Sequence, residues 1–167
     1  RLYALHDREK FEVYGYSLHP GDGSALRRDI EQGCDVFREL SELENHAAAE
    51  IIRRDGIDIL IDLAGYTSHA RSEIFALRPA PLQLCYPHST GADFIDYFVA
   101  DPVIVPPAAE QFFSEKIARL PDSYFLFDNQ QPIAPAMPKR EAMGLPTEGM
   151  VFCCHNNNYK ITPDVFD

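Results

Sequence analysis

The sequence has 167 residues, of which 46% are hydrophobic and 25% are charged. This balance is typical of a soluble globular protein with one domain of ordinary size and a little more. The formal net charge is -11 and no long basic run is present, so binding along a nucleic-acid backbone is not expected. No stretch of about 18 apolar residues occurs that would predict a membrane span. The chain begins at Arg1 rather than Met, so a fragment or a processed form of a longer protein is expected.

Strands and helices are predicted to alternate from the start of the chain. The β-branched and aromatic residues at 11–18 predict a strand covered on both faces. After a turn, Leu26, Ile30 and Cys34 recur at helical spacing, and a short extended piece is expected near 36–37. This order is the beginning of an α/β arrangement.

A second helix and a second long strand are expected next. Residues 41–44 have the form of a capping box, so a helix should follow them and end at 55–56. Its buried side should hold Ala48, Ile51 and Ile52. Residues 57–63 then predict a strand. Strands that alternate with helices favour a parallel sheet in a layered α/β fold.

The next segment is predicted to contain a loop, a short helix and two strands. The loop at 64–68 should lead into a helix over about 69–77, capped by Thr67 or Ser68. Two short strands are expected at 82–86 and 96–100. Ligands bind at the carboxyl ends of strands in such sheets, so the loop at 65–68 is a candidate site.

Residues 102–148 hold eight of the thirteen prolines and show little periodicity. A helix near 110–116 and a strand at 117–120 are expected within this segment, and a short helix at 140–143. The rest is interpreted as a connecting segment. The predicted organisation is therefore a first lobe over 1–148 and the opening strand and helix of a second lobe over 149–167.

The last eighteen residues carry the clearest chemical signal. An apolar run at 150–154 predicts a strand, polar residues at 155–158 a loop, and Thr162-Pro163 the start of a helix. Lys160 lies just before that helix. A helix N-terminus and a lysine together suit a phosphate-bearing ligand. Lys160 taken alone could equally be a solvated surface lysine.

Two arginines of the middle segment have competing interpretations. Arg71 is expected in the first turn of its helix, where a cation opposes the helix dipole. Its partner should be Glu73 or Asp62, or else an anionic ligand. Arg78 is expected to fix the chain by hydrogen bonds to backbone carbonyls.

The histidines and cysteines predict neither a metal site nor a redox site. His69, His88 and His155 are spaced too widely for a metal-binding motif. The four cysteines show no CxxC spacing, so buried free thiols in a reducing cytoplasm are expected. Asp62 and Asp101 lie at strand ends but form no recognisable acid pair.

Several motifs together resemble the catalytic region of the peptide O-linked N-acetylglucosamine transferases, including the SPINDLY-like proteins and bacterial homologues. The motifs read DGIDILIDLAGYT at 55–67, AR at 70–71, FALRPAPLQ at 75–83, STGA at 89–92 and FCCHNNNYKITP at 152–163. The resemblance covers nearly the whole chain. It implies a GT-B architecture, of which this chain would be the Rossmann-like, three-layer first lobe and the opening of the second.

The resemblance also implies roles for individual residues. Lys160 would contact the nucleotide diphosphate and stabilise the leaving group. Asn157 and Tyr159 would lie near the donor, as would the segment that contains Tyr86 and Pro87. Tyr66 and Arg71 would support the active site on its acceptor side. No cofactor is implied, and catalysis is expected to need no metal.

The chain departs from the family pattern between the strand at 82–86 and Ser89. It lacks the tryptophan of the family's Trp-Leu-Gly-Tyr-Pro-Gly run, is shorter there, and has His88 where glycine is expected. Only glycine permits the closest backbone approach to a ligand.

The resemblance implies an inverting transfer of N-acetylglucosamine from UDP-GlcNAc to serine or threonine hydroxyls of proteins, in the cytoplasm. Two alternatives stay open: the same fold with another donor such as GDP-fucose, or a non-catalytic interaction fragment. The implied partners are a nucleotide sugar, a protein or peptide acceptor, the rest of the second lobe, and upstream tetratricopeptide repeats.

Overall fold

The computed structural model of the chain describes residues 2–155, 157 and 162–166. The chain divides into two compact units, Arg1–Asn129 and Gln130–Asp167. The first holds all the β-strands of the described residues, and the second holds two short helical elements. The predicted lobe boundary at 148/149 stays a prediction.

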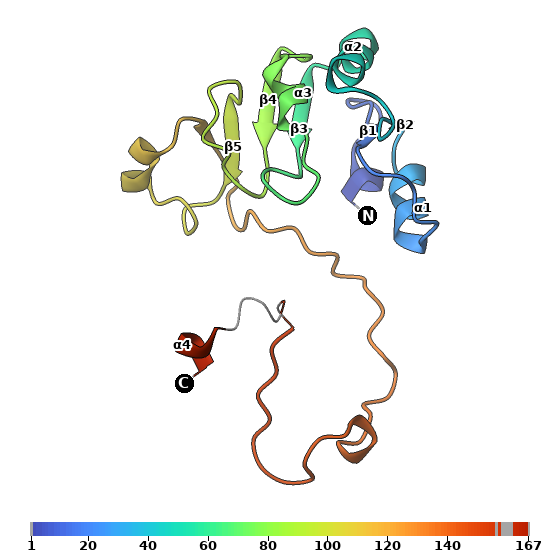
Figure 1. The fold of residues 1–167 in the computed structure, drawn as a ribbon, viewed down its shortest axis with the longest axis vertical. Coiled ribbons are helices and arrows are strands. Elements are labelled where there is room, and N and C mark those ends of the chain that lie inside the picture. The colour runs from blue at the N-terminus through green and yellow to red at the C-terminus, as the bar shows by residue number, and fades with distance from the viewer. Residues whose placement is uncertain (1, 156, 158–161, 167) are drawn as a thin grey trace. The chain divides into compact units, whose positions relative to one another are not determined.

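The first unit begins with a short parallel sheet (Figure 1). Strand β1 pairs in parallel with β2, with Tyr14 opposite Val36, as the strand–helix–strand pattern predicts. The elements in order are the 3-10 helix η1 (Leu2–Leu5), β1 (Tyr14–Ser17), α1 (Ala25–Gln32), β2 (Val36–Glu39) and α2 (Asn45–Asp55).

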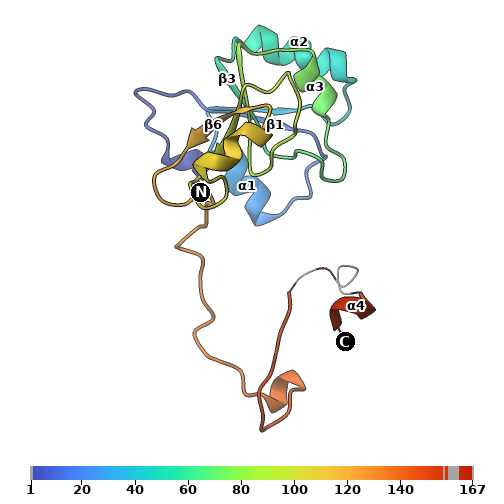
Figure 2. The ribbon, with the colours of Figure 1, turned by 90° about the vertical axis from the view of Figure 1, so that its left-hand side faces the viewer.

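A four-stranded sheet follows, in the order β3-β4-β5-β6, and all its strands are parallel. Figures 1 and 2 show these strands with the helices of the unit around them. The elements are β3 (Ile59–Asp62), α3 (Ser72–Ala76), β4 (Leu82–Cys85), β5 (Tyr97–Ala100), the 3-10 helix η2 (Pro107–Phe112) and β6 (Lys116–Arg119). The strand expected at 117–120 is thus confirmed as β6. The helix expected at 110–116 is replaced by η2, which begins and ends a few residues earlier in the sequence.

The core lies between one face of the four-stranded sheet and helices α2 and α3. The core residues alternate along the strands and recur at helical spacing on the helices, since these are the two side-chain periods. They include Leu60, Cys85, Phe98 and Ala100 from the sheet, and Ala48, Ile52, Ile74 and Phe75 from the helices. On the other face of β3, Ile59 and Ile61 are 51% and 46% exposed.

Two of the predicted helix caps are wrong. Helix α2 begins after Glu44, which makes no side-chain cap hydrogen bond, so residues 41–44 form no capping box. Helix α3 begins after Arg71, so neither Thr67 nor Ser68 caps it. The reason is local, because His69 has a φ of 65°, which no helical residue can adopt. By contrast, Ser24 caps α1 as its residue type favours.

The second unit contains the 3-10 helix η3 (Glu141–Met143) and helix α4 (Pro163–Phe166). The helix starts at Pro163, as expected, but the strand expected at 150–154 is not formed. A strand needs a partner for its backbone N–H and C=O groups, and the described part of this unit contains none. Within the described residues, no helix has the length and apolar character needed to cross a membrane.

Candidate functional site

Two loops meet where strands β3 and β4 end. The carboxylate of Asp62 accepts hydrogen bonds from the backbone N–H groups of Ala64 at 2.8 Å and Gly65 at 3.1 Å. Gly65 has a φ of 53°, and a Cβ at that position would lie 3.8 Å from the Cβ of His88. The loop after β3 therefore turns sharply and packs against the loop after β4.

Tyr66 joins the same two loops. Its hydroxyl donates to the carbonyl of Thr90, while the residue as a whole is 72% exposed. The side chain is thus fixed at its tip and presents its ring to solvent. The structure therefore places Tyr66, a predicted site residue, at the carboxyl ends of parallel strands, where ligands bind in such sheets.

A buried carboxylate that the sequence does not single out holds the second loop. Glu115 is only 3% exposed and lies directly before β6. It accepts hydrogen bonds from the backbone N–H groups of Thr90 at 2.8 Å and Gly91 at 3.0 Å. It also accepts from the hydroxyls of Ser89, Thr90 and Ser114, each at 3.0–3.1 Å.

These hydrogen bonds keep Glu115 ionised. Burial by itself would raise its pKa, but the donated N–H groups of Glu115, Thr90 and Gly91 and the Ser89 hydroxyl outweigh burial and lower the pKa to about 2. The neighbouring Cys85 shows the opposite effect. Burial, and then the charge of Glu115, raise the pKa of its thiol to about 12. Cys85 is therefore a neutral thiol, 3.7 Å from a Glu115 oxygen.

Tyr86 and Pro87, the predicted donor-side residues, open the loop after β4. Both are half-buried. The Tyr86 hydroxyl accepts a hydrogen bond from the backbone N–H of Leu126 at 3.1 Å, and its ring meets that of Tyr124 edge-on. Contact with a donor sugar stays a prediction for these two residues.

Arg71 does not have either of its expected protein partners. Its guanidinium donates to the side-chain oxygen of Asn45 at 2.7 Å and to the carbonyls of Leu40 at 2.9 Å and Leu43. It lies at the N-cap of α3 and not in the first turn, and three oxygen acceptors face its positive charge. These hydrogen bonds hold the segment from Leu40 to the start of α2 against the start of α3.

Arg78 has the role predicted for it. Its guanidinium donates to the carbonyls of Phe94 at 2.8 Å and Pro81 at 3.1 Å. It also pairs with Asp96 at 3.1 Å.

The other predicted residues lie in the second unit. Asn157 is exposed, whereas Tyr159 and Lys160 lie outside the described residues. Their predicted donor and leaving-group roles stay predictions.

Neither the histidines nor the cysteines form a recognisable centre. The rings of His19 and His69 meet edge-on, with centroids 5.3 Å apart. Within the described part of the chain, no group of three or more potential metal-ligating side chains occurs. The cysteines are free, but only Cys85 is fully buried and Cys153 and Cys154 are exposed, so the expectation of buried thiols is wrong for that pair.

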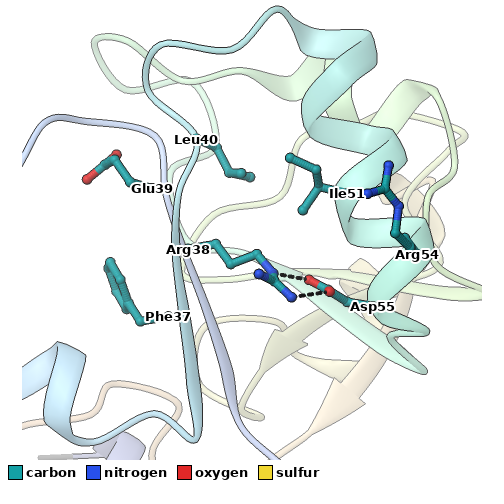
Figure 3. Close-up of a pocket in the computed structure, with 7 residues that line it drawn as sticks. All are labelled: Phe37, Arg38, Glu39, Leu40, Ile51, Arg54 and Asp55. Carbon is teal, nitrogen blue, oxygen red and sulfur yellow. Dashed lines mark hydrogen bonds and ion pairs between the residues drawn. The ribbon is translucent and has the colours of Figure 1, made fainter.

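A pocket between β2 and α2 lies outside the two strand-end loops (Figure 3). Figure 3 shows Arg38 and Asp55 pointing toward each other across it, and their side chains pair at 2.6 Å. The Arg38 hydrogen bond lowers the pKa of Asp55. Because these charges are paired, and no predicted site residue lines the pocket, it is not the candidate site.

Known proteins resemble this chain in sequence and in fold. A probable UDP-N-acetylglucosamine–peptide N-acetylglucosaminyltransferase SEC of Arabidopsis thaliana is 40% identical over 98% of this chain. A UDP-N-acetylglucosamine–peptide N-acetylglucosaminyltransferase of Caenorhabditis elegans is 44% identical over 76% of it. The chain spans only 18% and 11% of the length of these relatives.

A solved O-GlcNAc transferase mutant of Thermobaculum terrenum matches with a TM-score of 0.70 and 36% identity, over 74% of this chain and 24% of that one. With the parallel sheets, this match confirms the predicted α/β fold class, the first lobe of a GT-B glycosyltransferase. The model of glycosyl transferase family 41 matches residues 2–136. The chain therefore belongs to glycosyl transferase family 41.

Proposed function

We propose that the protein containing this chain transfers N-acetylglucosamine from UDP-GlcNAc to serine or threonine hydroxyls of peptides, with inversion at the anomeric carbon. The observation that carries the proposal is the 40% identity over 98% of the chain to a relative named for this transfer. Cytoplasmic action agrees with four cysteines that form no disulfide.

The proposed donor residues belong to two segments. Lys160 neutralises charge that builds on the diphosphate as the sugar leaves, and Asn157 and Tyr159 lie near the donor. Tyr86 and Pro87 approach it from the loop after β4. A positioned cation accelerates the reaction because it stabilises the transition state more than the ground state.

Tyr66 and Arg71 have different proposed roles on the acceptor side. The exposed ring of Tyr66 is available to a peptide or sugar. Arg71 has its guanidinium committed to Asn45, Leu40 and Leu43. It therefore supports the site through the segment between β2 and α2, without touching the acceptor.

The test uses the full-length protein, a serine- and threonine-containing peptide and two donors, UDP-GlcNAc and GDP-fucose. Mass spectrometry of the peptide identifies the sugar that is transferred, and NMR of the product gives its anomeric configuration. The expected result is a β-linked N-acetylglucosamine. Transfer of fucose would show that GDP-fucose is the donor instead of UDP-GlcNAc. The absence of transfer from either donor would favour the non-catalytic alternative.

A further inference from the structure

The loop at 89–91 is held by a single carboxylate from a distant part of the chain. Glu115 takes both backbone N–H groups of Thr90 and Gly91 and the hydroxyls of Ser89 and Thr90. Parallel pairing of β4 with β5 does not require these contacts, since the loop residues lie outside both strands. The loop's own donors are thereby turned inward, and they are not available to bind an anion.

Thr90 connects this carboxylate to the exposed surface of the site. Its N–H and hydroxyl donate to Glu115, and its carbonyl accepts the hydroxyl of Tyr66. Thr90 is 7% exposed, so all its polar groups are paired inside the protein. The position of the Tyr66 ring thus depends on a chain of hydrogen bonds that ends at Glu115.

We propose that Glu115 is a positioning residue of the transfer site, which fixes the 89–91 loop and, through Thr90, sets the place of the Tyr66 ring. The effect on transfer rests on the proposed function, whereas the effect on the loop does not. Glu115 touches no substrate itself, because it is buried beneath the loop.

The chemistry of the site requires a charged acceptor of this length. An ionised carboxylate has only acceptor sites, and it faces donors. In Glu115→Gln the charge is lost, so the oxygen that faces the two backbone N–H groups becomes a weaker acceptor. The new NH₂ group faces the Ser89 and Ser114 hydroxyls, which must then accept instead of donate. Glu115→Asp keeps the charge but draws it back by one methylene. Loop order should therefore decrease from Glu to Asp to Gln.

Hydrogen–deuterium exchange of the full-length protein tests the loop directly. In Glu115→Gln, the amides of Thr90 and Gly91 should exchange at least about tenfold faster, while the amides of α2 keep their protection. Glu115→Asp should give a smaller increase in the exchange rate of the same amides. If the Gln variant does not fold, the Asp variant takes its place in this test. Glu110→Gln is the matched control, because Glu110 lies on the surface and pairs with Arg119, away from the loop.

Kinetics with the donor that the wild-type protein turns over test the link to the site. Glu115→Gln should lower kcat about 10- to 100-fold, as expected when a site residue is displaced. The dissociation constant of UDP should change by no more than about twofold, since the loop N–H groups donate to Glu115 and not to a ligand. The effects of Glu115→Gln and Tyr66→Phe on kcat should be less than additive, because both act through Thr90.

The outcomes separate this inference from the proposed function. Wild-type exchange at Thr90 and Gly91 in a folded Glu115→Gln variant would overturn the anchoring of the loop. Additive effects with Tyr66→Phe, or a loss of activity that only follows the folded fraction, would overturn the positioning role. If the wild-type protein transfers no sugar but Thr90 and Gly91 exchange faster in Glu115→Gln, the proposed function is wrong. The role of Glu115 in holding the 89–91 loop is then still supported.

Discussion

Buried acidic residues hold the loops at the strand ends in place. Asp62, Asp101 and Glu115 are 5%, 4% and 3% exposed. Each accepts backbone N–H groups of a loop, as Asp101 does from Val103, Ile104 and Tyr124. Buried carboxylates are costly unless hydrogen-bonded, and here each is satisfied by the loop that it orders. The negative charges of these three residues thus hold the loops around the candidate site in place.

Glu115 should make the free energy of unfolding decrease as the pH falls. Its pKa is about 2 in the folded protein, against an ordinary value of 4.5. Because the folded pKa is the lower one, the carboxylate stabilises the fold fully above the ordinary value, and this stabilisation is lost as the pH falls toward 2. The difference corresponds to about 3 kcal/mol.

Urea unfolding of wild-type protein and Glu115→Gln checks this prediction. The difference in unfolding free energy should be constant between about pH 6 and 8 and should narrow between about pH 5 and 3. A difference that stays constant down to about pH 3 would show that the folded carboxylate is not held ionised.

Lys160 is the residue whose loss should most impair the proposed transfer. In the full-length protein, Lys160→Ala should lower kcat/KM by about 100-fold or more, on the order of 3 kcal/mol, since a positioned cation offsets charge on the leaving diphosphate. Steady-state kinetics with UDP-GlcNAc measure this. Lys139→Ala, which changes an exposed lysine of the same unit, is the control. Wild-type rates in folded Lys160→Ala would remove the lysine from the mechanism.

At the scale of elements, one arginine ties helix α3 to the segment before α2. The Arg71 guanidinium spans the side chain of Asn45 and the carbonyls of Leu40 and Leu43. Leu40 is 1% exposed, so the segment belongs to the core. A planar group with several donors in fixed directions suits this arrangement better than a lysine ammonium.

Arg71→Lys should therefore weaken the packing of α2 and α3 although the charge is kept. The local free energy of opening, from hydrogen exchange of the α2 and α3 amides in the full-length protein, should fall by about 1–3 kcal/mol. Arg54→Lys, on the exposed side of α2, should have little effect. If Arg71→Lys leaves exchange unchanged and weakens ligand binding, an anion-binding role would replace the structural one.

At the scale of the molecule, the chain exposes surface that a stable domain usually covers. Ile59, Ile61 and Leu63 are about half exposed at β3. Exposed apolar side chains of this kind mark contact regions or cause association. The chain spans 18% of the length of a relative that it otherwise matches almost throughout.

The 167-residue chain by itself should therefore be inactive, should bind UDP weakly and should tend to associate. Transfer assays and size-exclusion chromatography of the purified chain check this. Addition of the remaining segments of the full-length protein should restore transfer. Transfer by the chain alone, at rates near those of the full-length protein, would contradict the proposed division between two lobes.

The sequence by itself determined the order of strands and helices and the family. Apolar and β-branched runs placed β1 and β3 within a few residues, because side-chain periodicity is a local property of the chain. The same local signals misplaced the start of α3, where the backbone of His69 turns the chain. They also predicted a strand at 150–154, where the described residues offer no partner to pair with.

Only the tertiary structure decided what the polar residues do. Glu115 lies 25 residues from Thr90 in sequence, so no spacing rule connects them, and the local pattern predicts a helix at Glu115. Arg71 likewise finds its partners 26 to 31 residues away. These hydrogen bonds form because folding brings segments that are far apart in the sequence close together, and a one-dimensional pattern does not contain that distance.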